Sequence, residues 1–251
     1  MRWLLPKRRR LSRRQRLVLP DKDFSAIYAI GDIHGCAREY KEAESRILAD
    51  ARFHPGTKLI ILLGDYVDRG PDSRTVLEAL EAPPARGFTR IALCGNHDDE
   101  FAKMVRNPRE IGSWLQFAGS MTLLSYGIDA QHIVEMNGLK ALHDIVTELV
   151  PERHVALLEA LPVCVKVGGI VFVHAGVRPS IALEEQTDRD LMWIREPFLG
   201  RGPELPFIVV HGHSPFITPS LGTSRIGIDT GASSTGVLTV LKISDGRYSF
   251  I

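Results

Sequence analysis

The sequence predicts an α/β protein. Three observations indicate this class: short apolar runs typical of buried strands, apolar residues at helical spacing between them, and glycine-flanked polar residues directly after the strands. The chain has 251 residues, of which 44% are hydrophobic and 24% charged, as is ordinary for a soluble globular protein. This length fits one large α/β domain or two small ones.

The first hundred residues alternate between strand and helix patterns. Between the first two strands, apolar residues recur at intervals of three and four from Cys36 to Ala51. A second helix is expected to open at 71–73, with Val76, Leu77 and Leu80 on its inner face. The three expected strands are Ala26–Ile30, Lys58–Leu63 and Arg90–Cys94. This order predicts a right-handed parallel unit.

The middle of the chain, from about 101 to 161, has a helical pattern, and strands return after it. One helical face is expected from 139 to 149, before Pro151. The later strands are expected at 169–173, 207–210, 225–228 and 237–243. Residues 247–251 are expected to pair with the last of these across the turn 244–246.

Polar, glycine-flanked segments follow five of the expected strands. They are GDIHG (31–35), GDYVDRG (64–70), GNHDD (95–99), HAG (174–176) and HGH (211–213). Ligands of open α/β sheets gather outside the carboxyl ends of the strands. We therefore expect a common site of carboxylate, amide and imidazole groups from Asp32, His34, Asp65, Asn96, His174 and His213. Such groups suit divalent manganese, iron or zinc, and two ions bridged by a carboxylate form a hydrolytic centre.

Each segment has a simpler interpretation when taken alone. An aspartate after a strand is most often part of a turn, and a histidine at a strand end is most often a satisfied structural residue. The placement of the histidines argues against this interpretation. Five of the nine follow expected strands directly, namely His34, His97, His174, His211 and His213.

The motifs GDIHG, GDYVDRG and GNHD, followed in order by HAG and GHS, resemble the signature of the phosphoprotein phosphatase family of metallophosphoesterases. The bacterial and phage branch is the most similar, with its lambda phosphatase-like serine/threonine phosphatases and symmetrical diadenosine tetraphosphate hydrolases. The resemblance covers Ile27 to Ile243. It implies a calcineurin-like sandwich of two mixed β-sheets flanked by helices, in a catalytic domain spanning residues 23–251. It also implies two divalent metal ions, with manganese expected and iron or zinc as alternatives.

The resemblance implies a role for each matching residue. One metal would be held by Asp32, His34 and Asp65, and the other by Asp65, Asn96, His174 and His213, with Asp65 as the bridge. A hydroxide between the metals would attack phosphorus in line. His97, oriented by Asp68, would protonate the leaving group. Arg69 and Arg195 would bind the phosphate oxygens.

Two residues fit the family pattern less directly. The family ligand matches the histidine after Gly212, so His213 is assigned to metal, and His211 is expected to support a ligand or to face the phosphate. Asp98 stands where the commonest family motif has glutamate. This position is not a ligand in the family, and we expect the change to alter only local hydrogen bonding.

The resemblance implies a phosphomonoesterase, with phosphoserine and phosphothreonine proteins as the favoured substrates. The alternatives are a symmetrical diadenosine tetraphosphate hydrolase and a phosphotyrosine-directed phosphatase using the same site. A non-catalytic binding protein would need a degenerate site, whereas all six expected metal positions hold competent ligands. The segment Ser113–Gly127 resembles an insertion beside the catalytic pocket of bacterial members, and substrate specificity is expected there. Its Trp114, Phe117 and Met121 also fall at the spacing of ordinary helix packing.

The N-terminus is strongly basic. The first sixteen residues carry eight of the 31 lysines and arginines and no acidic residue, although the net charge of the chain is only +1. We expect residues 1–22 to form a disordered tail. The alternative is an arm that contacts anionic lipid, nucleic acid or another protein. The oligomeric state is left open.

The cysteines and the apolar runs bear on the cellular location. The chain has three cysteines without paired spacing, which disfavours disulfides and favours a reducing cytoplasm. The apolar runs are too short to span a bilayer, so no transmembrane segment is expected.

Overall fold

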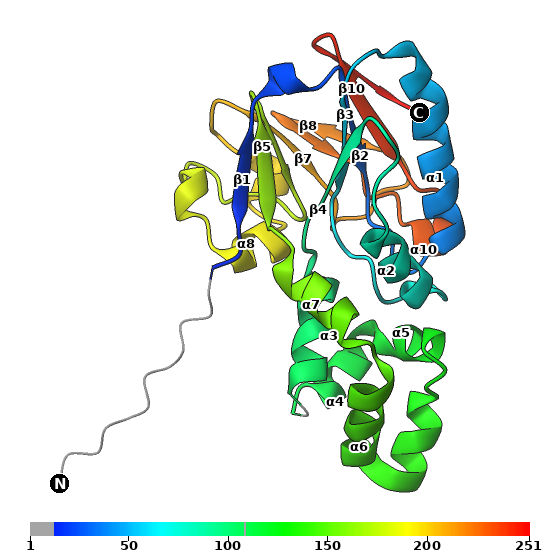
Figure 1. Ribbon diagram of the computed structural model, residues 1–251. Coiled ribbons are helices and arrows are strands. Elements are labelled where there is room, and N and C mark those ends of the chain that lie inside the picture. The colour runs from blue at the N-terminus through cyan, green and yellow to red at the C-terminus, as the bar shows by residue number, and fades with distance from the viewer. Residues whose placement is uncertain (1–12, 108) are drawn as a thin grey trace, which may run out of the picture.

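Two mixed β-sheets pack face to face in the structure, a computed structural model that describes residues 13–107 and 109–251 (Figure 1). The first sheet has the order β11-β10-β2-β3-β4, with β2 (Ala26–Ile30), β3 (Lys58–Leu62), β4 (Phe88–Ala92), β10 (Val240–Ser244) and β11 (Arg247–Phe250). The second has the order β1-β5-β6-β7-β9-β8, with β1 (Arg16–Leu19), β5 (Cys164–Val167), β6 (Ile170–Val173), β7 (Ile208–His211), β8 (Ser220–Gly222) and β9 (Arg225–Gly227). The predicted α/β class with two mixed sheets is confirmed.

The first sheet contains the parallel unit predicted from the sequence. Strands β2, β3 and β4 run parallel, and β10 pairs antiparallel with both β2 and β11. Alternate strand residues face opposite sides of a sheet. Tyr28 and Ile30 therefore join the core beneath α1 (Ala37–Asp50) and α2 (Ser73–Glu81), while Ile27 and Ala29 join the layer between the two sheets.

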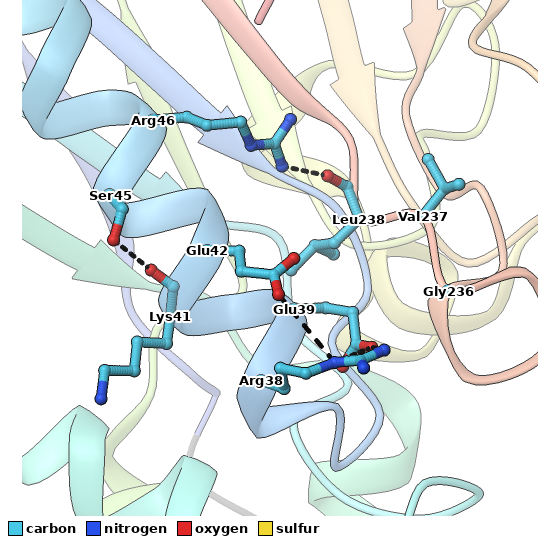
Figure 2. A pocket seen from close by; sticks show the side chains of 9 residues that line it. All are labelled: Arg38, Glu39, Lys41, Glu42, Ser45, Arg46, Gly236, Val237 and Leu238. Carbon is cyan, nitrogen blue, oxygen red and sulfur yellow. Dashed lines mark hydrogen bonds and ion pairs between the residues drawn. The ribbon is translucent and has the colours of Figure 1, made fainter.

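The outer surface of α1 meets the loop that precedes β10. The Arg46 guanidinium donates to the Leu238 carbonyl at 2.7 Å (Figure 2). A surface pocket of about 730 Å³ lies here, and Figure 2 shows Arg38 paired with Glu39 at 2.6 Å and with Glu42 at 4.0 Å. We assign this pocket no role.

The predicted helical middle of the chain is confirmed and lies below both sheets in Figure 1. It consists of α3 (Asn96–Arg106), α4 (Ile111–Trp114), a π-helical segment (Leu115–Gly119), α5 (Ser120–Ser125), α6 (Ala130–Leu149) and α7 (Glu152–Ala160). Three short helices follow, α8 (Asp188–Trp193), α9 (Phe198–Arg201) and α10 (Ala232–Thr235), and short 3₁₀ turns lie at Asp21–Asp23, Ala51–Phe53 and Leu183–Glu185. Within the described residues, no helix combines the length and the hydrophobicity needed to cross a bilayer. All three cysteines are buried and free.

The prediction of a disordered tail over residues 1–22 is wrong for the part that the structure describes. Strand β1 forms the edge of the second sheet, parallel to β5, with Arg16 opposite Cys164. The Arg14 guanidinium donates to Asp99 Oδ1 and to the Leu158 carbonyl, both at 2.8 Å. The prediction assumed that the basic residues repel one another, but the body of the protein supplies acceptors for them. Residues 1–12, with the rest of the basic run, lie outside the described residues.

Candidate active site

Loops at the carboxyl ends of five strands bring the six predicted metal ligands together. His174 Nε2 lies 2.9 Å from Asn96 Oδ1 and 3.4 Å from Asp65 Oδ2. The His213 backbone N–H donates to Asp32 Oδ2 at 2.9 Å. All six side chains are buried. The strand ends therefore converge as the sequence predicts, and the role of each residue as a ligand stays a prediction.

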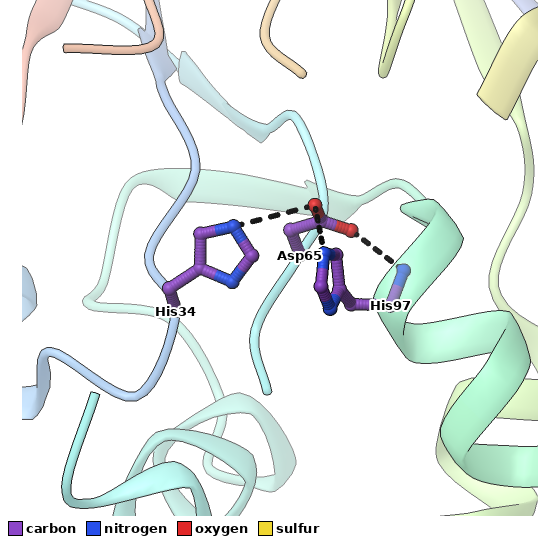
Figure 3. A group of neighbouring side chains, drawn as sticks. All are labelled: His34, Asp65 and His97. Carbon is purple, nitrogen blue, oxygen red and sulfur yellow. Dashed lines mark hydrogen bonds and ion pairs between the residues drawn. The ribbon is translucent and has the colours of Figure 1, made fainter. Parts of the chain in front are cut away.

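Asp65 lies at the centre of this arrangement. Its Oδ2 is 3.5 Å from His34 Nε2 and 4.0 Å from His97 Nε2, and Figure 3 shows this oxygen facing both rings. Two groups of candidate ligand atoms, each within 4.8 Å of one another, share Asp65: one with His34 and His97, the other with His174 and His213. A shared carboxylate fits the predicted bridge. The first group contains His97 where the sequence predicts Asp32.

Unpartnered polar atoms show that the site fits a cation. Asp32 Oδ1, His34 Nε2 and His213 Nε2 are buried without a hydrogen-bond partner in the structure. Burying such atoms unpaired is costly, so each needs a partner of another kind. Carboxylate oxygen and imidazole nitrogen suit divalent manganese, iron or zinc. The residues present thus fit a divalent metal centre.

The pKa values of the buried groups agree with this interpretation. Burial alone would raise the pKa of Asp65, but the positive charges of His174 and His97 lower it well below its ordinary value. Burial acts to lower the pKa of His174, but the carboxylates of Asp65 and Asp32 raise it to about 10. Burial lowers the pKa values of His34 and His213 to about 3, so both imidazoles are neutral and can bind a metal. The carboxylates therefore attract positive charge into the site.

The backbone around the site is held in uncommon conformations. Residues with side chains rarely adopt positive φ, and such strain gathers at functional sites. Five site residues adopt it: His34 (45°), Asp65 (54°), Asp68 (70°), Arg69 (69°) and His213 (62°). Two glycines allow close approach, since a Cβ on Gly95 would lie 2.1 Å from Asp65 Oδ1 and one on Gly212 would lie 1.9 Å from Asp32 Oδ1. The glycines of GNH and HGH therefore make room for carboxylates.

His97 and Asp68, the residues predicted to act as the acid pair, lie in contact, and their catalytic role stays a prediction. His97 Nδ1 is 2.7 Å from Asp68 Oδ2, which fixes the tautomer in which Nδ1 donates. Asp68 Oδ1 in turn accepts from the Thr122 hydroxyl of α5 at 2.6 Å. No pattern in the sequence pointed to Thr122, because its contact depends on how α5 packs below the sheets.

The two predicted phosphate-binding arginines lie at the exposed side of the site. Arg69 Nη2 is 3.3 Å from His97 Nε2, and Arg195 Nη2 donates to the His213 carbonyl at 3.3 Å. A guanidinium has five N–H donors, so each group keeps donors for an anion.

Asp98 has a larger role than the sequence predicts. Its buried carboxylate accepts three backbone N–H groups, from Asp65 and Tyr66 at 2.8 Å and from Gly95 at 2.9 Å. These donors belong to the two loops that carry Asp65 and Asn96. Asp98 therefore joins the two loops and orients the central carboxylate.

We expect Asp98→Asn to weaken metal binding by about 10-fold and to lower the free energy of unfolding by about 1–3 kcal/mol. Asparagine has one acceptor oxygen fewer than aspartate. Its amide nitrogen would therefore face a backbone N–H group that in the wild type donates to the Asp98 carboxylate. Chelator competition and urea unfolding measure the two effects. The matched control is Glu100→Gln on the same helix, where the carboxylate pairs with Lys103. Unchanged metal affinity and stability in Asp98→Asn would contradict the role.

Asp229 is a further buried carboxylate that the sequence analysis missed. It follows β9, its Oδ1 accepts from the Gly231 N–H at 2.9 Å, and its Oδ2 has no partner. Burial contributes most to raising the pKa of Asp32, and the negative charge of Asp229 raises that pKa further. A pattern in the sequence could have indicated Asp229. The segment DTG (229–231) follows the expected strand 225–228 and places an aspartate near a glycine at a strand end, as the other site segments do.

His211 lies outside both groups of ligand atoms. Its ring packs edge-on against Phe198 with centroids 5.1 Å apart, and Nδ1 is 3.0 Å from the Gly212 carbonyl oxygen. Burial lowers its pKa to about 4. The assignment of His213 rather than His211 to the cluster agrees with the geometry, and the support that His211 gives a ligand stays a prediction.

Most of the chain is similar to a known protein family. Residues 25–236 match the model described as calcineurin-like phosphoesterase. Among curated relatives, the symmetrical bis(5'-nucleosyl)-tetraphosphatase of Aromatoleum aromaticum is 32% identical over 163 residues, or 63% of this chain and 47% of that protein. The asymmetrical bis(5'-nucleosyl)-tetraphosphatase PrpE of Geobacillus thermodenitrificans is 24% identical over 234 residues, or 85% of this chain and 88% of that protein. The match to the first relative thus spans about half of its length.

Solved structures show the same fold. One described as a candidate diadenosine tetraphosphatase has a TM-score of 0.64 at 20% identity, covering 95% of this chain and 97% of the other. A serine/threonine phosphatase from Saccharomyces cerevisiae has a TM-score of 0.53 at 15% identity, covering 94% and 78%. The family match spans every residue of the site, and the chain therefore belongs to the calcineurin-like phosphoesterase family of metal-dependent hydrolases.

Proposed function

We propose that the chain hydrolyses dinucleoside tetraphosphates by cleaving a phosphoanhydride bond. The observation that supports this most directly is the match to bis(5'-nucleosyl)-tetraphosphatases, one of them over 85% of the chain. The sequence alone favours a protein phosphatase and keeps this activity as an alternative. The relatives reverse that order, because they are named for a nucleotide substrate.

The metal centre would be built from the residues predicted for it. Asp32, His34 and Asp65 would hold one divalent ion, and Asp65, Asn96, His174 and His213 the other, with manganese proposed and iron or zinc as alternatives. When bound, the ions would polarise the phosphoryl oxygens and lower the pKa of water toward neutrality.

The other side chains act on the substrate itself. The 2.7 Å contact with Asp68 holds Nδ1–H of His97 away from the substrate and would stabilise the imidazolium form, whose Nε2–H proton can then pass to the leaving oxygen and leave the neutral ring. Arg69 lies 3.3 Å from that Nε2, and its guanidinium can bind phosphoryl oxygens as charge spreads over them. This arrangement serves phosphoanhydrides and phosphoesters alike.

The acid pair favours a second candidate function. Protonation of the leaving group matters most when that group is a poor one, such as the alkoxide of serine or threonine. A phosphoserine and phosphothreonine phosphatase therefore remains the alternative, and a phosphotyrosine substrate tests the same site with a better leaving group.

A substrate panel separates these functions. Diadenosine tetraphosphate and peptides with phosphoserine, phosphothreonine or phosphotyrosine are incubated with the protein and manganese, then with iron or zinc. We expect the highest kcat/KM for the dinucleotide, with two molecules of ADP indicating symmetrical cleavage and ATP plus AMP asymmetrical cleavage. Asp65→Asn, purified in parallel, controls for contaminating phosphatases. Turnover of phosphopeptides alone would overturn the proposal, and no turnover of any substrate would indicate a binding protein.

A further inference from the structure

Two aromatic rings border the site next to the proposed acid. The Phe117 ring stacks on His97, with centroids 4.4 Å apart and an angle of 20° between the planes. The Trp193 ring lies 5.7 Å from Phe117 and meets the His213 ring edge-on at 6.3 Å. We propose that Phe117 and Trp193, here called the aromatic pair, stack against a nucleobase of the substrate and thereby select nucleotides. The proposal rests on the function proposed above.

Core packing accounts for one aromatic residue of this region but not for Phe117. Trp114 is 2% exposed and packs 5.4 Å from Phe101, as a core residue does. Phe117 is 41% exposed, although it stacks on a histidine that is 1% exposed. A large apolar side chain left open to solvent directly above a catalytic group gains little from folding. Its position is explained if a planar ligand covers it.

The local backbone conformation places the Phe117 ring over His97. It lies within the segment Leu115–Gly119 between α4 and α5, where the chain is kinked at Ala118 (φ 172°, ψ 10°). A Cβ on Gly119 would lie 2.4 Å from the Trp114 ring, so only glycine lets the chain pass so close to that ring. Trp114 thus turns into the core while Phe117 lies over His97.

Trp193 is held in place and is only half-buried, so part of its ring stays open to solvent. The Arg189 guanidinium lies 5.9 Å from the centroid of its ring, on the same helix. An aromatic face next to arginine is the combination that binds a base by stacking and an adjacent phosphate by charge.

Binding measurements test the aromatic pair without turnover. The dissociation constants of ADP and of pyrophosphate are measured by calorimetry on the manganese-loaded protein, and their ratio isolates the contribution of the nucleoside. Stacking on one aromatic side chain predicts that Phe117→Leu and Trp193→Leu each weaken ADP binding, relative to pyrophosphate, by about 5- to 100-fold. Phe117→Tyr, which keeps a ring, should restore the wild-type ratio.

The control is Phe53→Leu. Phe53 is 81% exposed and follows the end of α1, at the opposite end of the strands from the site. Unfolding midpoints of all variants show whether each one folds, and Phe117→Tyr and Trp193→Leu provide the test if Phe117→Leu does not. A structural effect of Phe117 on His97 would change both dissociation constants and leave their ratio unaltered.

The outcomes separate this proposal from the proposed function. An unchanged ratio in the leucine variants overturns the aromatic pair, even when diadenosine tetraphosphate is a good substrate. A reduced ratio supports the pair, even when the dinucleotide is not cleaved, and in that case only the proposed reaction fails.

Discussion

Replacing Asp65 with asparagine is expected to lower kcat/KM by about 10³-fold or more and to release both metal ions. Oδ2 of this carboxylate lies 3.5 Å from His34 Nε2 and 3.4 Å from His174 Nε2, so one oxygen is close to both groups of candidate ligands. The amide removes the negative charge that the two ions would share. Metal content after gel filtration and kcat/KM on the preferred substrate are the measurements.

A neighbouring residue provides the control for Asp65→Asn. Asp72 lies on the same loop and caps α2 by accepting from the Thr75 N–H. Asparagine caps helices as well as aspartate does, so Asp72→Asn should keep both metal and activity. Two metal ions per chain and full activity in Asp65→Asn would show that the carboxylate is not a shared ligand.

The second large effect is expected for His97→Ala, which should lower kcat by about 10²- to 10⁴-fold while both metals stay bound. The loss should be greater for phosphoserine than for p-nitrophenyl phosphate, because an alkoxide needs a proton more than a nitrophenolate does. His97 also lies within 4.8 Å of the candidate ligand atoms of His34 and Asp65. Metal analysis therefore decides whether it acts as an acid or as a ligand.

His132→Ala is the matched control for that variant, since His132 is an exposed residue of α6. It should change neither rate nor metal content. Equal losses on the two substrates in His97→Ala would contradict the acid role, and loss of a metal ion would assign His97 to the metal centre.

Among the strands, the sequence predicted those that are apolar on both faces. Strands β2, β3, β6 and β7 are such runs, and their carboxyl ends locate the site. The prediction missed β1, which it placed in a tail, β5, whose CVKV contains a lysine, and β8, an edge strand of three residues. Such strands are stabilised by their neighbours in the sheet rather than by their own composition.

In the site, too, some residues could be predicted from the sequence and others could not. Ligand types are visible in a sequence, because chemistry restricts which residues bind a metal. Supporting contacts are not visible: Thr122 reaches Asp68 from another helix, and Asp98 joins two loops that only the folded chain brings together. Phe117 lies in the segment where substrate specificity was expected, but its spacing also fitted ordinary helix packing, because the kink at Ala118 leaves no mark on apolar spacing.

The N-terminal strand has a consequence for how the protein folds during synthesis. Strand β1 leaves the ribosome well before its partner β5, and Arg14 binds the Leu158 carbonyl 144 residues further along. Contacts so distant in sequence form late, because a long loop must close first. The outer edge of β5 thus stays open until β1 returns to it, and an open strand edge can pair with other chains. Strand β1 is therefore made before β5 but takes its place in the sheet only after β5 is made.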